Sequence, residues 1–114
     1  MPRKIRVAAV QMDVKPAPTL ERLARAVSQV RVAASQGAEL AVLPELFNTG
    51  YAYIDENYAR AEPMNGQTIE WMLSTARSMN LYLAGTLLVR DGEDIYNRML
   101  VVSPEGRTWT YDKN

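Results

Sequence analysis

Hydrophobic and polar residues along the first 43 positions follow a pattern of strand, helix and strand. Residues 5–12 are β-branched and mostly apolar, which predicts a strand buried on both faces. Pro16 and Pro18 end this run, and Thr19 is a candidate N-cap for the helix. Residues 38–43 predict a second buried strand. The strand, helix and strand together span fewer than about 40 residues, which favours a right-handed βαβ unit with two parallel strands.

The helix between these strands is predicted from apolar residues that recur at steps of three and four positions, and Gly37 is its natural end. The residues expected to face the core are Leu20, Leu23, Ala24, Val27, Val30 and Ala34. The same region is rich in basic side chains, and we interpret them as a solvated surface rather than a functional patch. They are Arg3, Lys4, Arg6, Lys15, Arg22, Arg25 and Arg31.

The second half of the chain predicts one more helix and then a meander of strands. No regular element is expected over residues 52–65. An amphipathic helix follows Gly66, and the next apolar run predicts a buried strand over residues 81–89. A turn at Asp91-Gly92 should pair this strand antiparallel with residues 95–102. A further turn precedes the last strand, over residues 107–111.

Composition and charge restrict the function. Thirteen basic and thirteen acidic residues balance, so we expect no nucleic-acid partner. No apolar run approaches the ~18 residues of a membrane span, so no membrane is expected either. The chain has no Cys and no His, which excludes disulfides, Cys or His zinc sites and His-assisted nucleophiles within it. We expect a cytoplasmic protein that needs no cofactor and no metal.

Glu45 is the first candidate for chemistry, because it lies in the loop after the second predicted strand. Open α/β sheets place their ligands at the carboxyl ends of strands. Its apolar neighbours would desolvate the carboxylate and raise its pKa toward the range of a general base. The alternative is a solvated carboxylate, or one that caps a nearby helix. Lys113, taken alone, is a weaker candidate for chemistry than Glu45.

Several motifs together resemble the N-terminal portion of the nitrilase superfamily, the carbon–nitrogen hydrolases. The specific part is a Leu-Pro-Glu-Leu-Phe block followed by Thr-Gly-Tyr. The motifs are residues 8–12 (AAVQM), residues 37–47 (GAELAVLPELF), Thr49-Gly50-Tyr51, Tyr96-Asn97 and Tyr111-Asp112-Lys113.

The resemblance implies an α/β fold with a mixed sheet, as part of a four-layer α-β-β-α sandwich. Residues 1–114 would then be the N-terminal part of one carbon–nitrogen hydrolase domain, truncated before the nucleophilic Cys. Within the family's Glu-Lys-Cys set, Glu45 and Lys113 match the first two members, and the Cys has no counterpart in this chain. Tyr51 resembles a substrate-pocket residue, although a Tyr after Gly is as often simply packed. The sequence predicts a structural role for Asn97.

The function implied by the resemblance is hydrolysis of non-peptide carbon–nitrogen bonds. An amidase acting on a small aliphatic or ω-amide substrate is expected, with the 114-residue chain inactive by itself. The alternatives are a carbamoyl-amide hydrolase of the same family and a non-catalytic fragment that acts only in assembly. A small-molecule amide is the expected substrate, and the complete protein is expected to form a homo-oligomer, such as a dimer.

Overall fold

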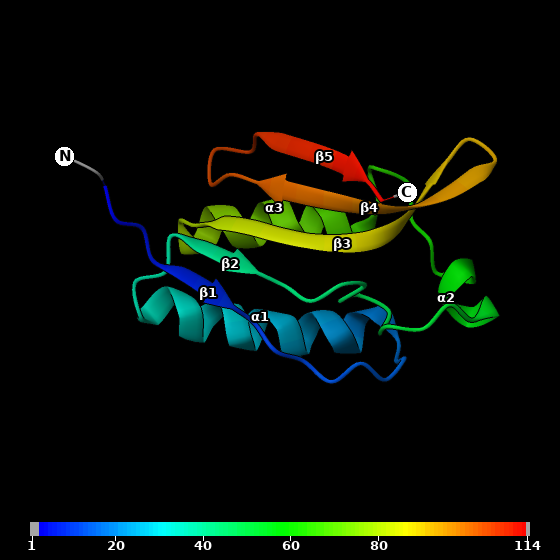
Figure 1. Ribbon diagram of the computed structural model, residues 1–114, viewed down its shortest axis with the longest axis horizontal. Coiled ribbons are helices and arrows are strands. Elements are labelled where there is room, and N and C mark those ends of the chain that lie inside the picture. Colours follow the sequence, from blue (N-terminus) through cyan, green and yellow to red (C-terminus); the bar gives the residue numbers. More distant parts are fainter. Residues whose placement is uncertain (1–2, 114) are drawn as a thin grey trace.

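A mixed sheet of five strands forms the centre of the computed structural model, which describes residues 3–113 (Figure 1). The strands lie side by side in chain order, and β1, β2 and β3 are parallel whereas β3, β4 and β5 are antiparallel. The βαβ unit and the terminal meander are therefore confirmed, and so is the α/β class. The strands are β1 (Val7–Ala9), β2 (Leu40–Val42), β3 (Tyr82–Asp91), β4 (Asp94–Val102) and β5 (Thr108–Asp112).

Two long helices, α1 (Thr19–Ser35) and α3 (Gln67–Met79), contact each other and pack on one face of the sheet (Figure 1). The predicted core face of α1 is only partly right. Leu23 and Val30 are buried, but Leu20 is 72% exposed and Ala24 is also exposed. The buried stripe is instead completed by Thr19, Arg22, Ala26 and Ala33.

The start of α1 also differs from the expectation. Pro18 occupies the N-cap position, no side chain caps the helix, and Thr19 is already its first helical residue. Proline is tolerated at the start of a helix because the N–H that it lacks would have no partner there.

β1, at the edge of the sheet, is exposed on one face, so the prediction of a strand buried on both faces is wrong. Val7 is 50% exposed, because α1 and α3 cover only the other face of the sheet. Tyr82 of β3 lies on the same uncovered face as Val7, because both are aligned with Leu40 in the strand pairing. The Tyr82 ring stacks on Trp109 with centroids 6.4 Å apart. This face carries the residues of the candidate site at the end where β2 and β5 finish.

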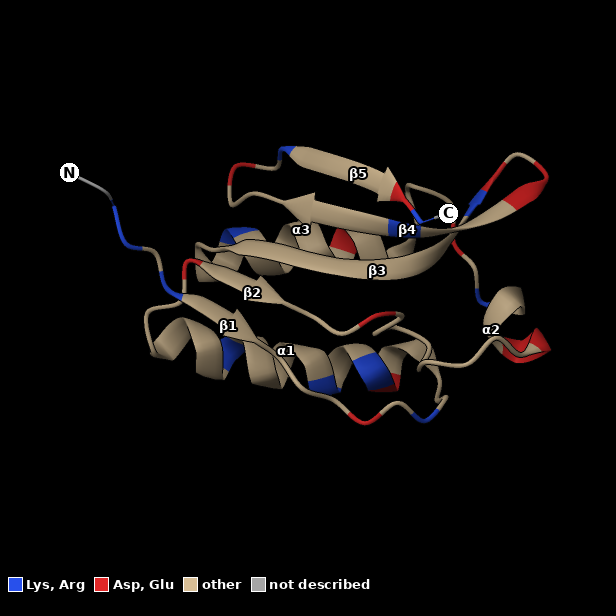
Figure 2. Ribbon diagram, viewed as in Figure 1, with Lys and Arg blue, Asp and Glu red and all other residues tan. Residues whose placement is uncertain are grey.

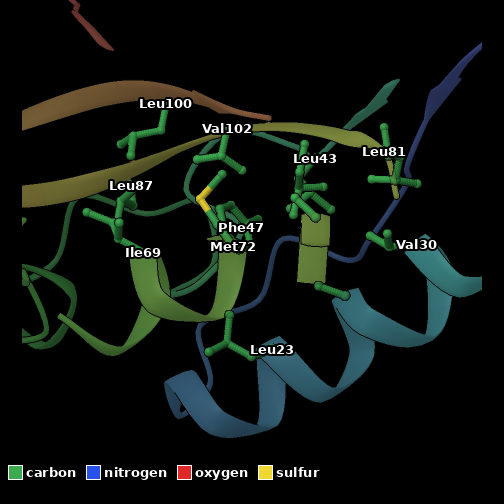
Figure 3. Packing of buried hydrophobic residues seen from close by; sticks show 14 of the residues in the cluster. Leu23, Val30, Leu43, Phe47, Ile69, Met72, Leu81, Leu87, Leu100 and Val102 are labelled. Carbon is green, nitrogen blue, oxygen red and sulfur yellow. The ribbon is translucent and has the colours of Figure 1, made fainter. Parts of the chain in front are cut away.

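The core lies between the sheet and the two helices (Figure 3). Leucines of β3 and β4 meet apolar side chains of α1 and α3, and the Phe47 ring enters the same cluster from the loop after β2. A Cβ on Gly85 would lie only 2.8 Å from the Phe47 ring, so β3 requires glycine where that ring packs. The loop after β2 is thereby held against the centre of the sheet.

A short helix, α2 (Asp55–Ala59), lies within the stretch for which no element was expected. Five residues are too few to show helical periodicity in the sequence. Its buried Asn57 donates hydrogen bonds to the carbonyls of Gly50 (3.1 Å) and Ala52 (2.8 Å), which ties α2 to the loop after β2. Among the described residues, no helix combines the length and the apolar character that crossing a membrane requires.

Candidate active site

Glu45 belongs to the loop that follows β2, and the backbone of this loop is fixed from several sides. Leu46 has a φ of +54°, a left-handed conformation that costs energy in a branched residue. It is held there because its side chain is fully buried and its N–H donates to Thr86 Oγ1 at 2.9 Å. Strain adjacent to Glu45 is thus maintained by packing on β3.

Arg22 supports the same loop from α1. Its Nε donates to the Phe47 carbonyl at 2.7 Å and its Nη1 to the Lys15 carbonyl at 3.0 Å. The side chain is 1% exposed and lies 3.6 Å from an Asp13 carboxylate oxygen. Burial lowers the pKa of Arg22, against the opposing effect of Asp13. The prediction of a solvated basic surface is therefore wrong for Arg22, which is a buried support of the loop.

Gly50 ends the loop at a close contact between backbones. A Cβ there would lie 2.6 Å from the Lys15 carbonyl oxygen, and the φ of +93° is a conformation that glycine adopts readily. The Thr-Gly-Tyr motif therefore has a structural reason, because the glycine lets the segment before α1 lie against the loop of Glu45.

Lys113 reaches the site through the pairing of β5 with β4. Arg98 and Asp112 are partners in the register, and Arg98 Nε donates to Asp112 Oδ1 at 2.6 Å. Charged residues of the two strands meet near the C-terminal end in Figure 2. The Lys113 backbone N–H then donates to the Asn97 carbonyl at 2.9 Å. This register places the Lys113 side chain on the uncovered face, beside Glu45.

Glu45, Lys113 and Asn97 come together in one cluster. Lys113 Nζ lies 2.9 Å from Glu45 Oε2, and Asn97 Nδ2 donates to the same oxygen at 2.6 Å. The Glu45 side chain is 30% exposed and that of Lys113 is 56% exposed, so the ion pair is open to solvent on one side. Two residues that lie 68 positions apart in the chain thus share one site. The sequence gives no sign of the contact with Asn97.

The pKa of Glu45 shifts in the direction opposite to the expectation. The hydrogen bond from Lys113 lowers the pKa of Glu45, and this effect together with that of Asn97 outweighs the opposing effect of burial. The same hydrogen bond raises the pKa of Lys113. Apolar neighbours in the sequence suggested desolvation, but they are directed into the core whereas Glu45 faces a cation. In this arrangement both groups are charged at neutral pH.

Tyr51 lies at the open side of the cluster and is 44% exposed. Its ring meets that of Tyr53 edge-on, with centroids 5.7 Å apart, and Tyr53 in turn contacts Tyr58 of α2. The Tyr53 hydroxyl accepts a hydrogen bond from Asn97 Nδ2 at 3.1 Å. Three tyrosines therefore form a continuous aromatic surface next to Glu45, and only Tyr51 was singled out from the sequence.

A second carboxylate, Glu62, is buried behind the same loop and was not predicted. Its Oε1 accepts the Thr68 N–H at 2.7 Å at the N-terminus of α3, and its Oε2 accepts the Thr68 hydroxyl and Asn48 Nδ2. An acidic residue shortly before a helix start is the signal that could have indicated it. Within residues 3–113, no group of three or more acidic, His or Cys side chains is arranged to hold a metal ion.

The chain belongs to the carbon–nitrogen hydrolase family, whose model matches residues 6–114. It is 33% identical over 112 residues to a nitrilase of Pyrococcus abyssi (strain GE5 / Orsay), covering 96% of this chain and 43% of that protein. It is 36% identical over 105 residues to the omega-amidase NIT2 of Danio rerio, covering 90% of this chain and 37% of the relative.

The fold also matches solved structures of the superfamily. The crystal structure of XC1258 from Xanthomonas campestris, a CN-hydrolase superfamily protein with an arsenic adduct in its active site, superimposes with a TM-score of 0.87 at 26% identity. The match covers 96% of this chain and 40% of XC1258. The chain thus spans less than half the length of these relatives.

Proposed function

We propose that Glu45 and Lys113 are two members of a Glu-Lys-Cys set that hydrolyses amide carbon–nitrogen bonds, with the nucleophilic Cys outside this chain. The observation that carries the proposal is the 2.9 Å contact between Lys113 Nζ and Glu45 Oε2 at the end of the sheet. Membership of the carbon–nitrogen hydrolase family supports it. The chain contains no Cys, so we infer that the 114 residues alone are inactive.

The chemistry of such a set follows from the two charges. The Glu45 carboxylate removes the thiol proton, and the thiolate attacks the amide carbon. The proton passes to the departing nitrogen, which leaves as ammonia, and water then hydrolyses the thioester to the acid and the free thiol. The Lys113 ammonium stabilises the oxyanion, and one such donor contributes on the order of 10²–10³-fold in rate. Tyr51 contacts the substrate at the open side.

A small aliphatic or ω-amide is the substrate class that we propose, because several similar vertebrate proteins are named omega-amidases. The similarity to a nitrilase makes a small nitrile the second candidate. The proposal also includes a cytoplasmic location and a homo-oligomer of the complete protein, which cell fractionation and light scattering would test.

Ammonia release tests the function. The protein that contains this chain together with the nucleophilic segment should release ammonia from short ω-amides, and the 114-residue chain should release none. Lys113→Ala in the active protein should lower kcat/KM by on the order of 10²-fold with little change in melting temperature. Turnover by the chain alone, or an unchanged kcat/KM in Lys113→Ala, would contradict the assignment.

A further inference from the structure

Asn97 of β4 contacts both charged residues of the site. Its side-chain Nδ2 donates to Glu45 Oε2 at 2.6 Å, and its backbone carbonyl accepts the Lys113 N–H at 2.9 Å. Glu45 comes from the loop after β2 and Lys113 from the end of β5. The position of each charge relative to the other therefore depends on a residue in the strand that lies between them in the sheet.

The orientation of the Asn97 amide carries an energetic cost. Its Oδ1 is buried and has no hydrogen-bond partner among the described residues. An unpaired buried acceptor is destabilising. The opposite orientation of the amide would direct Oδ1 at the Glu45 carboxylate. The orientation found is thus the one that donates hydrogen bonds into the site.

Tyr53 contacts the donor end of the same amide. An Asn amide has two N–H donors, and Nδ2 is within hydrogen-bond distance of Glu45 Oε2 and of the Tyr53 hydroxyl (3.1 Å). The Tyr53 ring is itself fixed between Tyr51 and Tyr58, with centroid distances of 5.7 and 6.2 Å. The hydroxyl therefore belongs to a ring that contacts two other tyrosines, although all three rings are partly exposed to solvent.

We propose that Asn97 and Tyr53 are positioning residues that keep the Glu45 carboxylate ionised and aligned with Lys113. The inference rests on the proposed role of Glu45 as the base. Three groups face the carboxylate: Lys113 at the end of β5, Asn97 on β4 and Tyr53 in the segment before α2. All three lower the pKa of Glu45, and the effect of Lys113 is the largest.

The test compares Asn97→Leu and Tyr53→Phe with the matched control Tyr82→Phe, whose ring stacks on Trp109 and has no recorded contact with Glu45, in the protein that carries this chain and its nucleophile. Each variant's Glu45 carboxyl is titrated by carbon NMR, and kcat/KM is measured against pH. Asn97→Leu should raise the Glu45 pKa, move the acid limb of the profile to higher pH and lower kcat/KM about tenfold, the loss expected for one charge-assisted hydrogen bond. Tyr53→Phe should act in the same direction with a smaller effect, and Tyr82→Phe should change neither readout.

A folded Asn97→Leu protein in which Glu45 titrates as in the unmodified protein would overturn the proposal. If that variant does not fold, Tyr53→Phe decides, because it keeps the ring packing, and an unchanged Glu45 titration in it overturns the proposal. The NMR titration needs no turnover, so it separates this inference from the proposed function. A Glu45→Gln protein that keeps full turnover would overturn the function, whatever the titration shows.

Discussion

Glu45 lies in the loop after β2, and Glu62 accepts a hydrogen bond from Asn48 of the same loop, but the surroundings of the two carboxylates differ. Glu62 is 8% exposed and accepts hydrogen bonds from a backbone N–H, a hydroxyl and an amide, all within a short range of the chain. Glu45 is partly open to solvent, and its partners come from distant strands and include a cation. A carboxylate satisfied by backbone and hydroxyl donors stabilises a fold, whereas one that faces solvent beside a lysine is available for proton transfer.

Glu45→Gln should give the largest effect on turnover, and it distinguishes most clearly between a catalytic and a structural carboxylate. Gln keeps the shape and loses the basic oxygen, so turnover should fall by on the order of 10³-fold while the melting temperature changes by only about a few degrees. Ammonia release and thermal unfolding of the same preparation measure both quantities. A kcat close to that of the unmodified protein would place Glu45 among the structural residues with Glu62.

Arg22→Met should lower both stability and turnover, because Arg22 supports the loop that contains Glu45 and contacts Glu62. The substitution leaves the Phe47 and Lys15 carbonyls without their donor, so the free energy of unfolding should fall by about 3 kcal/mol. Turnover should fall as well, since Glu45 loses its support. The matched control is Arg25→Met on the same helix, whose ion pairs are exposed, and it should change the unfolding free energy by less than about 1 kcal/mol. Equal effects of the two variants in urea unfolding would contradict this role of Arg22.

Glu62→Gln should mainly affect stability. The new amide nitrogen would face another donor in a buried site, either the Thr68 N–H or Asn48 Nδ2, and the free energy of unfolding should fall by about 2 kcal/mol. In the fraction that stays folded, kcat should change by less than about tenfold, because Glu62 has no contact with Glu45 or Lys113 among those that the structure records. Glu56→Gln, at an exposed position of α2, provides the control and should leave stability unchanged. A larger loss of kcat than of stability would assign Glu62 to the reaction.

The sequence predicted the main strand segments and the two long helices because both depend on local periodicity. It could not predict that one face of β1 is exposed, since an apolar run does not show which of its faces is covered. Arg22 resembled any other basic residue of a surface helix, because its buried partners are backbone carbonyls that no side-chain pattern reveals. The resemblance predicted Glu45 and Lys113 as site residues, but not Asn97 as their partner or the direction of the Glu45 pKa shift. Both depend on the register between β4 and β5.

The smallest effect concerns the pH dependence of stability. The folded-state pKa of Glu45 is lowered, mainly by Lys113, so this pair stabilises the protein above the unfolded pKa of Glu, about 4.3, and the contribution is lost as the pH falls through the folded pKa. The pKa of Lys113 is raised by the same contact, so its contribution is present below its unfolded pKa and is lost as the pH rises through its folded pKa. Urea unfolding of the unmodified protein and of Glu45→Gln should therefore differ most near neutral pH, and the difference should shrink toward acid. The Arg98–Asp112 pair is present in both proteins, so its own acid dependence cancels in the comparison. A difference that stays constant or grows on acidification would show that the ion pair does not stabilise the folded chain.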